Sequence, residues 1–114
     1  MIDSYSLREL EARLLIREDD RMRGTTEDLA EAQGIMFICP KCFHEDGAVG
    51  AHSVLCWFKN RGVPDDEVPG PGRWNPSGTS LDDLTFVPPG AVSVLLTSGC
   101  GWHGFVRNGR ATLG

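Results

Sequence analysis

Two short turns, each carrying a pair of metal-ligating side chains, constrain this chain more than any other feature of its sequence. The motif C-P-K-C at residues 39–42 has two residues between its thiols, and C-G-W-H at residues 100–103 has the same spacing between a thiol and an imidazole. Two intervening residues let a tight turn aim both side chains at one ion. The turns are separated by residues 43–99, so a folded sheet must bring them together.

Three thiolates and one imidazole form the closed tetrahedral set that structural zinc prefers. Soft sulfur ligands also favour zinc over magnesium or calcium, with iron as an alternative. We therefore predict one zinc ion, held by Cys39, Cys42, Cys100 and His103.

Three further residues are alternative ligands. His44 lies two residues after Cys42, and His52 and Cys56 are four residues apart in a strand-like segment, where they would share a face. Within the apolar run V-L-C-W-F, Cys56 is typical of a buried core residue. His44 and His52 are more typical of solvated side chains at loop edges.

The composition favours a single small domain with many turns. The chain has 114 residues, of which 40% are hydrophobic, 14 are glycine and 7 are proline. No apolar run approaches the roughly 20 residues of a membrane span. The first residues lack a basic region followed by an apolar stretch, so we expect no secretory signal and a reducing compartment, the cytoplasm of a bacterial host or a virion.

Residues 1–34 are expected to form an N-terminal helical segment. Ser6 and Glu9 have the spacing of a capping box, and leucines follow at intervals of three and four residues. This pattern predicts a helix over 6–23 and a second, shorter helix from Thr25 or Thr26 to Gly34. Leu7, Leu10 and Leu14 form the apolar stripe of the first helix. We expect this stripe to be covered either by the chain's own β domain or by another chain, in which case it is a partner-binding surface.

Residues 35–114 are expected to form a zinc-binding β domain. Apolar runs at 35–38, 53–58, 84–87 and 91–97 predict strands, and Asn108-Gly109 predicts a hairpin between strands at 104–107 and 110–113. The predicted fold class is α+β and mainly β: a small antiparallel zinc-stabilised β domain preceded by an N-terminal helix or helical hairpin.

A proline- and glycine-rich loop spans residues 60–80. Its four prolines lower the entropy lost on ordering, and Trp74 is expected to anchor it to the core. Asp65, Asp66 and Glu67 keep its tip solvated and acidic. We expect this loop, with Trp74, to contact a partner; the alternative is a flexible insertion with no role.

Three segments carry a resemblance to a known family. Residues 34–42 (GIMFICPKC), 81–88 (LDDLTFVP) and 100–109 (CGWHGFVRNG) are similar to short, uncharacterised proteins encoded by tailed phages and prophages. The resemblance leaves the N-terminal segment outside; it implies a phage origin and a metal site but no established activity. The two ligand turns also resemble zinc ribbons, from which the long insertion and the histidine ligand depart.

The expected function is a non-catalytic interaction or assembly module of a phage or prophage, as a minor virion part or host-directed binder. Its partner would be a protein or a second copy, engaged through the N-terminal helix or the 60–80 loop. The zinc-deaminase, H-E-x-x-H, G-x-S-x-G and P-loop motifs are all missing from the sequence, which disfavours an enzyme.

Two alternatives stay open. The first is a zinc-ribbon-like nucleic-acid-binding protein, although residues 35–114 carry a net charge of only −1. Its basic residues would be Lys41, Lys59, Arg61, Arg73, Arg107 and Arg110, with Trp74 and Trp102 stacking on bases. The second is a small metal-dependent hydrolase using Glu45-Asp46 or Asp82-Asp83 as a proton shuttle.

Overall fold

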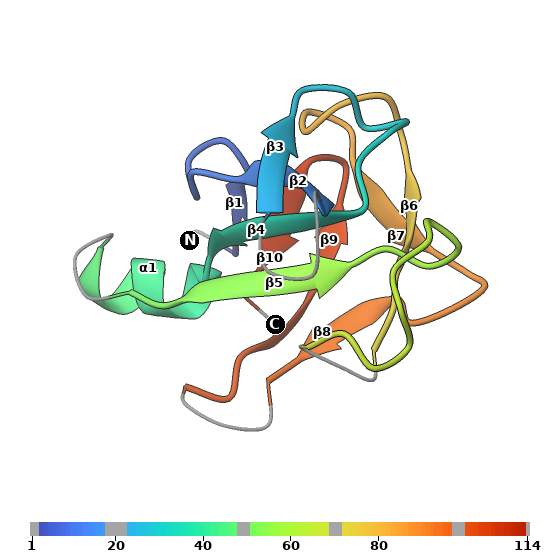
Figure 1. Cartoon of the computed structure of the whole chain (residues 1–114). Coiled ribbons are helices and arrows are strands. Elements are labelled where there is room, and N and C mark those ends of the chain that lie inside the picture. Colours follow the sequence, from blue (N-terminus) through green and yellow to red (C-terminus); the bar gives the residue numbers. More distant parts are fainter. Residues whose placement is uncertain (1–2, 18–22, 48–50, 69–71, 97–99, 114) are drawn as a thin grey trace.

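In the part of the chain that the structure describes, the fold consists of three antiparallel sheets and one short helix (Figure 1). It is taken from a computed structural model, which describes residues 3–17, 23–47, 51–68, 72–96 and 100–113. No helix among these residues is long and apolar enough to cross a membrane.

The first sheet has the strand order β1-β10-β9-β8 and joins the two ends of the chain. Ser4 of β1 pairs with Thr112 of β10. The hairpin between β9 and β10 turns at Asn108-Gly109, both with positive φ, as the Asn-Gly motif predicts. The strands are β1 (Ser4–Ser6), β8 (Ser93–Leu95), β9 (His103–Arg107) and β10 (Arg110–Thr112).

The second sheet has the order β3-β2-β4-β5. Its strands β4 and β5 fall where apolar runs predict them, and Ile38 pairs with Ser53 at the end of their ladder. A separate two-stranded sheet pairs β6 with β7. The strands are β2 (Arg13–Arg17), β3 (Arg23–Thr26), β4 (Gly34–Ile38), β5 (Ser53–Trp57), β6 (Asn75–Ser77) and β7 (Thr85–Val87).

The helix predicted over 6–23 is wrong. One half of the capping box forms: the Glu9 backbone N–H donates to the Ser6 hydroxyl at 3.1 Å, and this hydroxyl donates to the Glu9 carboxylate at 3.1 Å. The turn then ends at Glu11, where φ is 53°, and the chain continues as β2. Pairing of β2 with both β3 and β4 satisfies its backbone on two sides, which overrides the local helical pattern.

The second predicted helix, between Thr25 and Gly34, is also wrong. Residues 23–26 form β3, and a turn follows in which the Ala32 N–H donates to the Asp28 carbonyl at 3.1 Å. The helix among the described residues is instead α1 (Pro40–Asp46), which begins directly after β4. Strands β2 and β3 therefore share a sheet with β4 and β5, across the expected segment boundary at Gly34.

The core lies between the two four-stranded sheets. The rings of Phe37 on β4 and Trp102 before β9 meet edge to face, with centroids 6.0 Å apart. Both side chains are buried. Edge-to-face packing of large rings adds to the free energy of burial, and here it holds the sheets together at the end that carries α1.

Candidate metal centre

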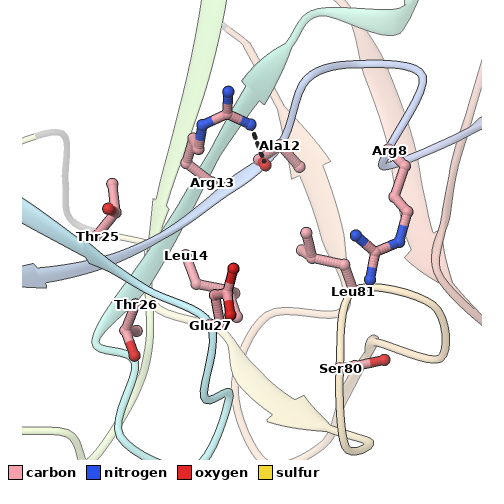
Figure 2. A pocket seen from close by; sticks show the side chains of 9 residues that line it. All are labelled: Arg8, Ala12, Arg13, Leu14, Thr25, Thr26, Glu27, Ser80 and Leu81. Atoms are coloured by element: carbon pink, nitrogen blue, oxygen red, sulfur yellow. Dashed lines mark hydrogen bonds between the residues drawn. The ribbon is translucent and has the colours of Figure 1, made fainter.

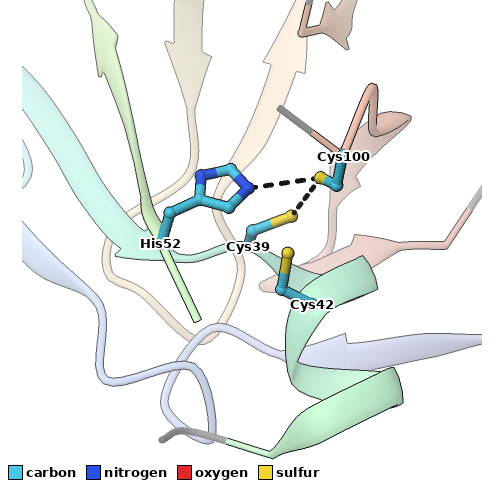
Figure 3. Close-up of side chains that lie close together, drawn as sticks. All are labelled: Cys39, Cys42, His52 and Cys100. Carbon is cyan, nitrogen blue, oxygen red and sulfur yellow. Dashed lines mark hydrogen bonds between the residues drawn. The ribbon is translucent and has the colours of Figure 1, made fainter. Parts of the chain in front are cut away.

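Four potential ligands converge where α1 meets the starts of β5 and β9 (Figure 3). Cys39 follows β4 and is the N-cap of α1, and Cys42 lies in the first turn of that helix. Because residues three apart on a helix lie on one side, both thiols point the same way. His52 immediately precedes β5, and Cys100 lies three residues before β9.

The distances fit one tetrahedral ion. The four ligand atoms all lie within 4.8 Å of one another. Cys100 Sγ is 3.5 Å from Cys39 Sγ and 3.2 Å from His52 Nε2. A zinc–sulfur bond of about 2.3 Å places the corners of a tetrahedron about 3.8 Å apart. The donor set and the spacing therefore both suit zinc, and the structure supports a Cys3His group that can bind such an ion.

Two hydrogen bonds that do not involve the ligand atoms connect the segments that carry the four residues. The Cys39 backbone N–H donates to the His52 carbonyl at 2.9 Å, and Lys41 Nζ donates to the Cys100 carbonyl at 2.9 Å. They connect the β4–α1 junction to each of the other two segments. The three segments are thus held together by the polypeptide itself.

The thiols differ in their acidity. Burial raises the pKa of Cys39 to about 12, and it also raises the pKa of Cys42. Burial also tends to raise the pKa of Cys100. Hydrogen bonds from His52, the Trp102 backbone N–H and the neighbouring thiols outweigh this effect and lower the pKa of Cys100 to about 7. Metal binding requires thiolates, so an arriving ion must displace protons chiefly from Cys39 and Cys42.

The structure brings His52, and not His103, to the three thiols. Side chains alternate between the two faces of an extended strand. Trp102 points into the core against Phe37, so His103 projects to the outer face of β9, where its side chain is exposed and its ring lies 6.2 Å from that of Phe105. The C-x2-H spacing therefore does not define the fourth member of this group.

The other two alternative ligands lie outside the group. The Nδ1 atom of exposed His44 is 2.8 Å from the hydroxyl of Tyr5. Cys56 is fully buried within β5, and that burial raises the pKa of its thiol. The interpretation of Cys56 as a core residue is confirmed.

The candidate partner-binding residues differ in how far they are buried. Leu7, Leu10 and Leu14 are buried within the chain's own core and form no exposed stripe. Trp74 is half-buried beside Phe86, and its Nε1 donates to the Ser93 carbonyl at 2.9 Å. Trp74 thus attaches the segment after residue 71 to β8.

Several residues of the nucleic-acid alternative are engaged within the fold. Trp102 is buried, and its Nε1 donates to the Thr112 carbonyl at 2.9 Å, so its ring cannot stack on a base. Arg61 donates to three backbone carbonyls of residues 29–32, and Arg73 donates to carbonyls of its own loop. Arg107 and Arg110 lie on the exposed face of the first sheet.

A separate hollow of about 630 Å³ lies between the β2–β3 ladder and the turn at residues 80–83 (Figure 2). Leu14 and Leu81 contribute apolar surface, while Arg8 pairs with Asp82 at the rim. This pair raises the pKa of Arg8 and lowers that of Asp82, through the hydrogen bond between them. The described lining also includes the Glu27 carboxylate and the Ser80 hydroxyl, and it contains neither histidine nor cysteine.

No protein-family model, curated protein or solved structure matches the chain. The similarity to short phage proteins therefore remains an expectation from the sequence. What the structure supports is a Cys3His group in a small, mainly β chain.

Proposed function

We propose that this chain is a non-catalytic, zinc-stabilised interaction module, with Cys39, Cys42, His52 and Cys100 holding one structural zinc. The observation that carries the proposal is the convergence of four donors from three chain segments within 4.8 Å. Structural zinc sites use four protein ligands, whereas catalytic sites keep one position for water or substrate. A complete set of four ligands favours the structural role.

The zinc would act as a clamp between the two four-stranded sheets. His52 leads into β5 of the second sheet, and Cys100 precedes β9 of the first. Binding one ion to both closes a long loop and adds its binding free energy to that of folding. A chain with a modest core gains most from such a clamp, and the fixed sheets then present stable surfaces to a partner.

The test is metal analysis of protein purified without chelator, combined with native mass spectrometry. We expect one zinc per chain, and Cys100→Ser should lose the metal and melt at a lower temperature. Cys56→Ala is the matched control, because it removes a thiol outside the group and should keep the zinc. Metal-free wild-type protein, or equal zinc loss in the two variants, would contradict the proposal.

A further inference from the structure

We propose that the outer face of the β1-β10-β9-β8 sheet binds single-stranded nucleic acid. The proposal names a partner class for the module proposed above and rests on that module being folded. It gives a role to side chains that the metal centre does not use.

The outer face is defined by alternation along β9. Gly104 and Val106 are buried, while His103, Phe105 and Arg107 project to the other side, with the two end residues exposed and the phenylalanine half-buried. These three side chains, two residues apart, form a single row. We call them the β9 row.

The β9 row is a series of three flat groups, of which the Arg107 guanidinium lies over the Phe105 ring. The Arg107 guanidinium carbon lies 4.1 Å from the centroid of the Phe105 ring. The centroid of the His103 ring is 6.2 Å from that of Phe105, at an interplanar angle of 36°. Unpaired bases stack on aromatic rings, histidine and arginine planes, and such stacking tolerates any base sequence.

A second cation extends the row across the sheet. Arg110 on β10 pairs with Arg107, and its side chain is also exposed. Its Nε donates to the Ser4 hydroxyl at 2.9 Å and an Nη donates to the Ser4 carbonyl at 3.1 Å. The guanidinium is therefore held in place beside the row, where it can meet a phosphate.

The charge distribution along the sequence points to the same partner. All 16 acidic residues precede residue 84, so residues 1–83 carry −7 while residues 84–114 carry +2. Strands β8, β9 and β10 thus have no carboxylate side chain. Carboxylates of other segments come close at the rims of this sheet: Asp3 precedes the edge strand β1, Glu9 bonds Ser6 of the same strand, and Asp82, paired with Arg8, belongs to the backbone that packs on Gly109. Strand β10 lies between β1 and β9.

A single strand matches this face better than an acidic protein. Both would supply anions for the two arginines, but only nucleic acid offers flat bases for the row. Leu95, which pairs with His103 and is 60% exposed, widens the apolar surface beside the imidazole. A duplex keeps its bases stacked inside and cannot use the row.

The experiment is fluorescence anisotropy of zinc-loaded protein with labelled 15-nucleotide oligo-dT and oligo-U, and with an abasic oligonucleotide of equal charge. We expect both base-containing probes to bind, with log affinity falling against log salt at a slope of about −1.4 for two phosphate contacts. The abasic probe, and the variant Phe105→Leu, should each weaken binding at least about fivefold, because stacking is lost.

Arg107→Gln should weaken binding and flatten the salt dependence, whereas Arg13→Gln, an equal charge change on β2, should do neither. Zinc content and melting temperature are measured for every variant. If folded, zinc-loaded wild-type protein does not bind the oligonucleotides, this proposal is contradicted, whereas the proposal of a structural zinc is not. Equal affinity for the abasic probe, for duplex DNA or for poly-glutamate would also overturn it.

Discussion

His52 Nε2 lies 3.2 Å from Cys100 Sγ, although the two residues are 48 positions apart in the sequence. The contact crosses from the start of β5 in one sheet to the segment before β9 in the other. The C-x2-H spacing pairs Cys100 with His103 in the sequence, but the fold places His52 beside Cys100. The candidate metal centre is therefore formed by the tertiary fold, because its ligands come together only when the two four-stranded sheets pack against each other.

Leu10 tests whether the N-terminal leucines stabilise this chain or serve a partner. Its side chain is fully buried, so Leu10→Ala should lower the free energy of unfolding by about 2–5 kcal/mol. The measurement is urea denaturation of the monomer. Leu95→Ala is the control, since that side chain is 60% exposed and its loss should change stability by no more than about 0.5 kcal/mol. Equal, small effects would show that the leucine is not part of the core.

Gly109 occupies a position that only glycine fits. Its φ is 73°, and an added Cβ would meet the backbone carbonyl oxygens of Leu81 and Asp82. Gly109→Ala should therefore cost about 2–4 kcal/mol in thermal or urea unfolding. Asn108→Gly, at the neighbouring positive-φ position, should be close to neutral. A tolerated alanine at 109 would mean that the β9–β10 hairpin does not pack on this turn.

Asp83 gives the fold a defined dependence on pH. Its carboxylate accepts hydrogen bonds from the backbone N–H of Ser80, the backbone N–H of Thr79 and the Thr79 hydroxyl, which lower its pKa. A lowered folded-state pKa stabilises the protein above the unfolded value of about 3.9, and this contribution disappears as pH falls through the folded value. Asp83→Asn should therefore melt at a lower temperature than wild type at pH 7.

The difference between Asp83→Asn and wild type should shrink steadily below pH 3.9. Asp66→Asn, which neutralises an exposed carboxylate in the 60–80 loop, is the control and should show a small difference at every pH. A gap that stays constant down to low pH would show that the charge of Asp83 is not what stabilises the turn.

Local chemistry was predictable from the sequence where few residues decide the conformation. The Asn108-Gly109 turn forms as its motif predicts, and so does the hydrogen bond from the Glu9 backbone N–H to the Ser6 hydroxyl. Each of these local structures depends on a few residues close together in the sequence, so each forms regardless of the tertiary context. The predicted strands at 35–38 and 53–58 also form, because short apolar runs suit strands that are covered on both sides.

The N-terminal strands could not be predicted in this way. Leu14 and Leu15 are adjacent and both buried, because β2 is covered on its two faces. Adjacent buried residues match neither the alternation of a half-exposed strand nor a single helical stripe, so the spacing from Leu7 to Leu14 resembled a helix. Pairing with β3 and β4 decides the conformation, and that pairing is not local.

The position of His52 could have been predicted from the register of two strands. Antiparallel pairing of 34–38 with 53–57 places His52 beside Cys39, and the Cys39 N–H donates to the His52 carbonyl. The C-x2-H spacing instead directs attention to His103, which alternation along β9 turns outward. A register argument about the two apolar runs would have favoured His52.

The most direct test of the account compares His52→Ala with His103→Ala, measuring zinc per chain and melting temperature after purification without chelator. We predict that His52→Ala loses most of its zinc and melts lower, while His103→Ala keeps one zinc and a melting temperature near that of wild type. Full zinc in His52→Ala together with loss in His103→Ala would contradict the Cys39, Cys42, His52 and Cys100 centre.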